Sequence, residues 1–177
     1  GGTSIGYSAF SGCSGLTSIT IPDGVTNIGG FAFEGCSGLT SITIGNNVTA
    51  IGDSAFSGCS SLTSITLPFV GGSRKTSSDT YQYPFGYIFG TSKYDGSIAT
   101  SQTYYGSSTS NTTSAAYYLP ASLKSVTITG GEILFGAFFN CESLTSITIP
   151  SSVTEIGSSA FSGCSGLTNI TIPSSVT

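Results

Sequence analysis

The sequence predicts a β-solenoid, in which stacked turns of the chain each contribute one short strand to a parallel sheet. The first observation is a fourteen-residue pattern of the type "AFSGCSGLTSITIP", which occurs five times and begins at positions 9, 32, 55, 137 and 160. The second is its period: Ile5, Ile28 and Ile51 lie 23 positions apart, as do Ile133 and Ile156. A fixed period of this length is typical of stacked repeat architectures.

The segment "LTSITI" is expected to form the strand of each turn. In the first copy, Leu16, Ile19 and Ile21 are apolar, and Thr20 alternates with the isoleucines, so one face is buried and the other is wet. β-Branched residues favour strands, and Pro22 ends the pairing because it lacks an N–H. A second short extended segment is expected from Val25 to Ile28.

The "AF.GC" segment is expected to turn the chain and fill the interior from the opposite, convex side. A left-handed backbone is predicted at the position before each Cys, because Gly or Asn occupies it. These residues are Gly12, Gly35, Gly58, Asn140 and Gly163. The phenylalanines are expected to stack in one internal ladder formed by Phe10, Phe33, Phe56, Phe138 and Phe161.

Between the third and fourth copies of the pattern the period breaks. After the strand that begins at Leu62, the next strand pattern consists of Leu123, Val126 and Ile128, which lies 61 positions on instead of 23. A rival register aligns residues 119–123 with residues 149–153, but it leaves no strand before Ile133. The first register predicts six strands and an insertion over residues 69–121.

The insertion differs from the repeats in composition. It holds eight of the nine Tyr and three of the four basic residues. Its apolar part, "PFGYIFG" at 84–90, is expected to replace the missing turn by placing Phe85, Ile88 or Phe89 in the core. The stretch "GSSTSNTTSAA" at 106–116 is of low complexity and is expected to be mobile.

The overall composition excludes several classes of function. Charged residues make up 7% of the chain, the formal net charge is −4, and there is no His. Nucleic-acid binding needs a basic stripe, which four basic residues cannot supply. No apolar run reaches the ~20 residues of a membrane span. The low charge and high Ser and Thr content favour a secreted or surface protein.

The combined motif "IG..AF.GC" and "LTSITIP" resembles the BspA-like leucine-rich repeats of bacterial surface proteins over residues 1–68 and 119–177. The resemblance implies a right-handed leucine-rich-repeat solenoid with a concave parallel sheet of about six strands and short extended or 3-10 segments on the convex side. It also implies adhesion or protein binding at the cell surface, with no enzymatic activity and no cofactor. One departure is Leu134, which stands where the other copies have Gly.

The five cysteines occupy one repeat position: Cys13, Cys36, Cys59, Cys141 and Cys164. Disulfides between neighbouring turns and metal binding are both conceivable for such a stack. The odd number of Cys, the absence of His and the long spacing argue against both. The favoured prediction is a buried ladder of reduced cysteines that pack as small apolar groups.

No catalytic or metal-binding residues are predicted. Nucleophilic catalysis would lack a His base, and the three lysines that could replace it (Lys75, Lys93 and Lys124) sit in no recognisable motif. Asp79 and Asp95 could serve as an acid pair, but nothing in the sequence brings them together. The chain is therefore predicted not to be an enzyme.

Ligand recognition is predicted in the insertion rather than on the strands. The outward strand positions are Ser and Thr, with one Asn, so the sheet presents a uniform hydroxyl surface that is poorly suited to an irregular partner. Tyr, Ser and Gly together are typical of adaptable binding loops. The candidate binding residues are Arg74, Lys75, Tyr81, Tyr83, Tyr87, Tyr94, Tyr104, Tyr105, Tyr117 and Tyr118.

The sequence thus favours a secreted or bacterial cell-surface adhesion module that binds a host or neighbouring-cell protein or glycan. One alternative is a structural spacer or stalk of a larger surface protein. Another is binding to ice or a crystalline surface through the Ser/Thr face. Residues 1–177 are expected to form one domain that is part of a longer array, because neither end carries a polar capping turn.

Overall fold

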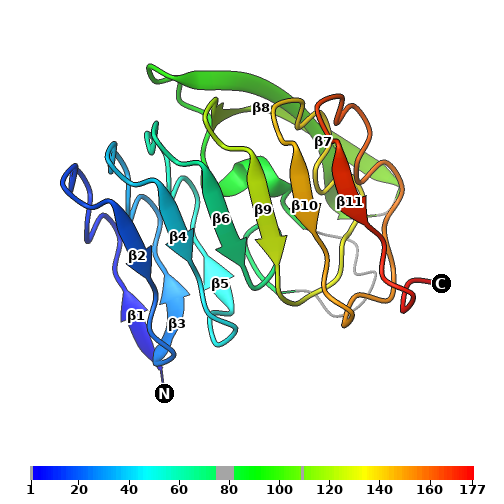
Figure 1. The fold of residues 1–177 in the computed structure, drawn as a ribbon, viewed down its shortest axis with the longest axis horizontal. Coiled ribbons are helices and arrows are strands. Elements are labelled where there is room, and N and C mark those ends of the chain that lie inside the picture. Colours follow the sequence, from blue (N-terminus) through cyan, green and yellow to red (C-terminus); the bar gives the residue numbers. More distant parts are fainter. Residues whose placement is uncertain (1, 75–81, 109) are drawn as a thin grey trace.

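The computed structural model describes residues 2–74, 82–108 and 110–177, and it contains the predicted six-stranded parallel sheet. Its spatial order is β11-β10-β9-β6-β4-β2, as Figure 1 shows. The strands are β2 (Ser18–Thr20), β4 (Ser41–Thr43), β6 (Ser64–Leu67), β9 (Ser125–Ile128), β10 (Ser146–Thr148) and β11 (Asn169–Thr171). The leucine-rich-repeat solenoid predicted from the sequence is therefore confirmed.

The sheet keeps its register across the insertion. Strand β6 pairs directly with β9, so that Ser64 lies beside Ser125 and Leu67 beside Ile128. The register through Leu123 is thus confirmed. The rival register is wrong because Leu119 and Pro120 pair with residues of the insertion itself.

A second, smaller parallel sheet forms another side of each turn. It consists of β1 (Thr3–Ile5), β3 (Val25–Ile28) and β5 (Ala50–Ile51). A single bridge between Ile133 and Ile156 repeats this pairing beyond the insertion. The second extended segment predicted from Val25 to Ile28 is therefore confirmed.

The third side of the solenoid is a stack of tight turns whose backbones bond to one another. The N–H of Phe10 donates to Ala32 at 2.7 Å, and the N–H of Phe33 donates to Ala55 at 2.8 Å. The predicted left-handed residues are confirmed, with φ between 59° at Asn140 and 78° at Gly58 and Gly163. A second left-handed position in the same turns was not predicted, because non-glycine residues hold it: Ser8, Phe31, Ser54 and Ser159.

The phenylalanine ladder exists, but it is broken in two. Phe10, Phe33 and Phe56 stack with ring centroids 5.3 and 5.4 Å apart, and Phe138 stacks on Phe161 at 5.6 Å. Between the two stacks lies the insertion, whose Phe85 contacts Phe89 at 5.2 Å and Phe138 at 5.1 Å. The single continuous ladder predicted from the sequence is therefore wrong, because the inserted turn supplies its own rings.

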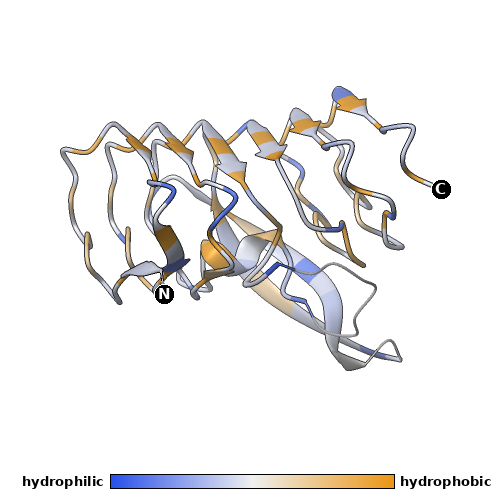
Figure 2. Ribbon diagram, turned by 90° about the horizontal axis from the view of Figure 1, so that it is seen from below, coloured by the Kyte–Doolittle hydropathy of each residue, from blue (hydrophilic) through white to orange (hydrophobic). Residues whose placement is uncertain are grey.

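The insertion is an ordered element rather than a loop. It forms the 3-10 helix η1 (Phe85–Ile88) and a long antiparallel hairpin of β7 (Ser97–Ser108) and β8 (Asn111–Pro120). The hairpin runs along the side of the solenoid opposite the six-stranded sheet (Figure 2). The mobility predicted for residues 106–116 is wrong, since most of them pair within this hairpin. The composition of residues 106–116 gave little signal for this pairing, because only their three Thr favour strands.

Helix η1 takes the place of one solenoid turn. The N–H of Phe56 donates to Ile88 at 2.8 Å, and the N–H of Phe85 donates to Ala137 at 2.8 Å, so both neighbouring turns find partners. Phe85, Ile88 and Phe89 are each at most 1% exposed. The prediction that "PFGYIFG" fills the core is therefore confirmed.

A buried glutamine of the hairpin completes this substitute turn. Gln102 of β7 is fully buried, and its side-chain oxygen accepts the N–H of Gly86 at 2.7 Å. Its side-chain nitrogen donates to the carbonyl of Phe139 at 2.9 Å and lies 3.5 Å from the Cys141 sulfur. One side chain thus joins η1, the hairpin and the next solenoid turn.

We expect Gln102→Ala to lower the free energy of unfolding by about 3 kcal/mol, because it leaves the Gly86 N–H and the Phe139 carbonyl without a partner in an interior that excludes water. Urea denaturation followed by circular dichroism measures the change. Thr112→Ala, at an exposed position of the same hairpin, should leave stability nearly unchanged. A loss below about 0.5 kcal/mol for Gln102→Ala would show that the network is not a structural support.

Candidate ligand-binding surfaces

The structure separates the candidate tyrosines into buried and accessible groups. Tyr104 and Tyr117 lie in the interface between hairpin and solenoid, at 7% and 4% exposure, so their rings are not available to a ligand. Burial raises the pKa of Tyr117, and a hydrogen bond with Tyr104 adds to this shift. Both residues are corrected from candidate binding residues to core residues of the insertion.

Tyr83 and Tyr87 form a half-buried aromatic pair. Their rings are stacked with centroids 3.9 Å apart, and Tyr83 also contacts Tyr104 at 5.8 Å. The pKa of Tyr87 is raised by burial and, to a lesser extent, by the nearby Tyr83 and Asp53. The structure therefore gathers three of the predicted tyrosines into one cluster at the edge of the insertion.

Tyr94, Tyr105 and Tyr118 lie apart from this cluster and are also half-buried. The hydroxyl of Tyr94 donates to the carbonyl of Tyr118 at 3.0 Å, and burial raises the pKa of Tyr94. Tyr105 stacks on Phe135 of the following solenoid turn, with centroids 4.2 Å apart. Part of each ring therefore stays accessible on the outer surface.

Arg74 contacts the backbone beyond the end of a main strand. Its guanidinium donates to the backbone carbonyl of Asn46, in the turn after β4, at 2.6 Å. Two other predicted binding residues, Lys75 and Tyr81, lie outside the described residues.

The outward face of the six-stranded sheet carries the hydroxyl array predicted from the sequence. The residues at equivalent strand positions lie side by side in strict register. They form a row of threonines (Thr20, Thr43, Thr66, Thr127, Thr148 and Thr171) and a row of serines that ends in Asn169. A further threonine row precedes the strands, in which Thr40 donates to the Thr17 carbonyl at 2.9 Å and Thr63 to that of Thr40 at 3.0 Å.

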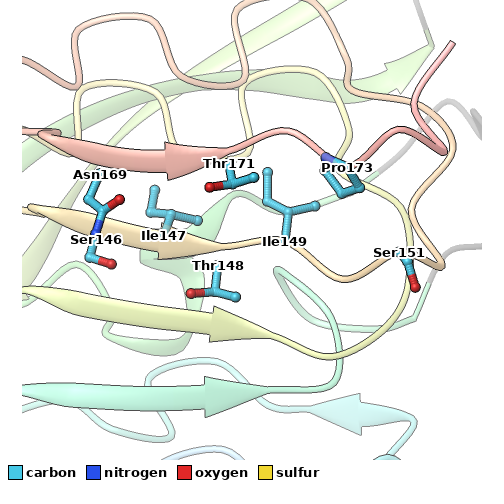
Figure 3. Close-up of a pocket in the computed structure, with 8 residues that line it drawn as sticks. All are labelled: Ser146, Ile147, Thr148, Ile149, Ser151, Asn169, Thr171 and Pro173. Atoms are coloured by element: carbon cyan, nitrogen blue, oxygen red, sulfur yellow. The ribbon is translucent and has the colours of Figure 1, made fainter.

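An open groove of about 450 Å³ lies on this face along β10 and β11 (Figure 3). Hydroxyl and amide groups from both strands line it, together with the apolar residues Ile147, Ile149 and Pro173. No charged side chain is among its described lining residues. The groove is thus suited to contact with an uncharged surface.

The predicted buried ladder of cysteines is confirmed for Cys36, Cys59 and Cys141, whereas Cys13 and Cys164 in the outer turns are only partly buried. All five are free thiols. The thiols of Cys36 and Cys59 each lie 3.3 Å from the carbonyl of a phenylalanine in the preceding turn, and that of Cys164 lies at 3.0 Å. Burial, followed by the charge of Cys36, raises the pKa of Cys59 to about 12. The Cys59 thiol therefore stays protonated at neutral pH and packs as a small apolar group.

The residues weighed for catalysis are only partly described, since Lys75 lies outside the described residues. Lys93, Asp95 and Lys124 are exposed, and Asp79 lies outside the described residues. Within the described part of the chain, no three His, Cys, Asp or Glu side chains gather where they could hold a metal ion. The described residues also include no helix long and apolar enough to cross a membrane.

Comparison with known families places these features in context. The family model described as "BspA type Leucine rich repeat region" matches six copies over residues 1–82 and 110–177. The chain belongs to the BspA-type leucine-rich repeat family. The unmatched residues, 83–109, hold η1, β7 and part of the tyrosine set, so the insertion departs from the BspA-type pattern where it replaces a turn.

A solved leucine-rich-repeat structure shares the fold. A leucine-rich repeat protein of T. pallidum superposes with a TM-score of 0.52 and 24% identity, covering 97% of this chain and 64% of that one. A leucine-rich repeat protein of Eubacterium ventriosum gives 0.48 and 20%, covering 91% and 40%, and a leucine rich cell surface protein of Faecalibacterium prausnitzii gives 0.32 and 23%, covering 95% and 82%. The chain thus spans less than two thirds of the T. pallidum protein. No curated protein matches it.

Because the pKa of the Cys59 thiol is raised, we expect the free energy of unfolding to fall at alkaline pH. An unfolded Cys ionises near 9, whereas Cys59 stays neutral in the fold up to about 12, so stability is full below pH 9 and falls as the pH rises towards 12. Denaturant unfolding of the wild type and Cys59→Ala at pH 8 and pH 10.5 measures this. We expect a smaller pH-dependent loss in Cys59→Ala, and equal losses in both proteins would contradict the assignment.

Proposed function

We propose that this BspA-type chain is a non-catalytic adhesion module of a secreted or bacterial cell-surface protein. Its partner is a host or neighbouring-cell protein or glycan, and recognition uses the accessible side of the aromatic insertion. Leucine-rich repeat modules typically serve in protein interaction, which supports the general part of this proposal. The low charge and the high Ser and Thr content are in keeping with an extracellular surface.

The observation that carries the proposal is the contrast between the hairpin and the solenoid. The six strands repeat the same side chains in the same register, so their face offers few features that could distinguish one irregular partner from another. The hairpin occurs once, lies on the opposite side, and breaks this uniformity (Figure 2). An element that differs from every repeat can recognise a partner that is not itself periodic.

The half-exposed tyrosines are the expected contact residues. Tyr83 and Tyr87 hold each other in a stack, and Phe135 holds Tyr105, so little side-chain freedom would be lost on binding. Tyr supplies a large amphipathic contact area at low entropic cost, which makes it a common anchor in binding sites. Tyr118 adds a fourth such ring on β8, and the hairpin strands carry no charged residue.

Deleting the insertion would not test this proposal cleanly, because residues 84–90 form a turn of the core. Single tyrosines should be replaced instead. In a binding screen against matrix proteins, mucins and glycans, Tyr105→Ala should weaken a detected interaction by about tenfold or more. Tyr7→Ala is a matched control, since Tyr7 is 72% exposed and also contacts a phenylalanine of the neighbouring turn.

The other outcomes are informative in different ways. Binding that survives both in the double variant Tyr105→Ala/Tyr118→Ala and in Tyr83→Ala/Tyr87→Ala would contradict the tyrosine surface and favour recognition by the six-stranded sheet. Folded wild-type protein that binds no member of a broad panel would favour a spacer or stalk that holds another domain away from the cell.

The strict register of six threonines supports a second candidate, binding to ice or a crystalline surface. Parallel strands lie about 4.8 Å apart, so the threonine methyl and hydroxyl groups repeat regularly along the sheet. Measurement of thermal hysteresis in the freezing of a protein solution tests the ice reading. A Thr66→Lys variant should abolish hysteresis, and its absence in the wild type would end this reading.

A further inference from the structure

We propose that a small pocket at the carboxyl ends of β4, β9 and β10 binds an acidic sugar residue through its carboxylate and hydroxyl groups. The pocket has a volume of about 360 Å³, which suits a single sugar ring. Its lining residues are Asn46, Arg74, Thr129, Gly130, Gly131, Glu132 and Ser152. They come from turns on both sides of the insertion, and Arg74 comes from the insertion itself.

Arg74 supplies a fixed positive charge. Its guanidinium donates to the Asn46 carbonyl at 2.6 Å, while the Asn46 side-chain oxygen accepts the Thr129 hydroxyl at 2.7 Å. Within the described part of the chain, no carboxylate forms an ion pair with Arg74. Most of the five guanidinium N–H groups therefore remain available for a carboxylate, which an arginine can hold through two parallel hydrogen bonds.

The backbone at Gly130 lies close to the Arg74 guanidinium. A Cβ on Gly130 would lie 2.9 Å from a terminal guanidinium nitrogen and 3.0 Å from the Pro68 carbonyl oxygen, so a side chain there would crowd the Arg74 guanidinium. Gly131 follows with a left-handed φ of 72°. The backbone N–H groups of both glycines donate to no other described residue, so they can add to an anion site.

The remaining lining groups match a polyhydroxylated ligand. Among the described lining residues, no side chain is apolar, and Asn46, Thr129 and Ser152 can donate to or accept from sugar hydroxyls. Glu132 is held in place by the backbone N–H groups of Thr154 and Glu155, both at 3.1 Å. Its carboxylate retains acceptor capacity, which suits a neutral hydroxyl donor.

These features favour a sugar acid over the carboxylate of a peptide C-terminus. A sugar acid carries hydroxyl groups around its carboxylate, which a peptide C-terminus lacks, and Asn46, Thr129 and Ser152 of the lining can bond to them. The proposal goes beyond the tyrosine surface and does not depend on it, since Arg74 contacts the strand ends rather than the tyrosines. An acidic glycan could thus be held by a site distinct from the hairpin.

Amide NMR titration of the folded chain tests the site with three small probes. D-glucuronate and D-glucose differ only in the carboxylate, and N-acetylglycine stands for a peptide C-terminus. We expect glucuronate to shift the Gly130 and Gly131 amide signals with a Kd on the order of 1 mM, as befits a ligand of its size. Glucose and N-acetylglycine should bind at least about tenfold more weakly.

Two variants and one control assign the effect to the pocket. Arg74→Gln should weaken glucuronate binding about tenfold or more by removing the charged donor, and Gly130→Ala should do the same by displacing the guanidinium. Lys93→Gln removes the same charge from an exposed site in the insertion and should leave binding unchanged.

Equal shifts with glucose and glucuronate, or unchanged binding in a folded Arg74→Gln variant, would overturn the proposal. Tighter binding of N-acetylglycine would replace the sugar by a peptide carboxylate and would also overturn it. Absence of any shift at about 20 mM glucuronate would mean that the pocket is not a carboxylate site. None of these results bears on the tyrosine surface, which the Tyr105→Ala variant tests separately.

Discussion

Hydrogen bonding from each turn to the next is the constraint on which the rest of the structure depends. A solenoid turn cannot satisfy its own backbone, so the N–H of one turn must meet a carbonyl of its neighbour. The same hydrogen-bonding requirement holds where the insertion interrupts the stack of repeat turns. Helix η1 supplies carbonyls to Ser54 and Phe56 and an N–H to Ala137, while Gln102 accepts the Gly86 N–H of η1 and donates to the Phe139 carbonyl. The insertion is therefore a substitute turn with a hairpin attached.

The solenoid turn that follows the insertion is adapted to receive the hairpin. Asn140 adopts the left-handed conformation that glycine has elsewhere, and its side chain donates to the Ser101 carbonyl of β7 at 2.8 Å. At Gly136, a Cβ would clash with the Thr103 carbonyl, whereas other copies carry a side chain there. Leu134 replaces a glycine that, at Gly52 and Gly157, is needed for close approach of the preceding turn. Asn140 and Gly136 thus depart from the repeat pattern where the hairpin docks.

The periodic part of the fold could be predicted because each repeat position has one mechanical role. The strands, the left-handed residues and the register across the insertion all follow from apolar spacing and from Gly or Asn. The hairpin could not be predicted in the same way, since Tyr, Ser and Thr are compatible with both a strand and a flexible loop. For the candidate site, composition identified the insertion but could not separate buried Tyr104 and Tyr117 from accessible Tyr105. The pocket beside Gly130 was missed because its residues lie far apart in the sequence and share no motif.

The pairing of insertion and receiving turn also constrains how such an array can change in length. Ordinary turns are interchangeable, because each offers the same backbone groups and the same Phe and Cys side chains to its neighbours. A duplication or loss of one ordinary turn would therefore leave the remaining contacts intact. The segment from η1 to Asn140 has no such freedom, since Gln102 and Asn140 join parts that fit only each other. We expect it to be inherited as one block, with the number of ordinary turns on either side free to vary.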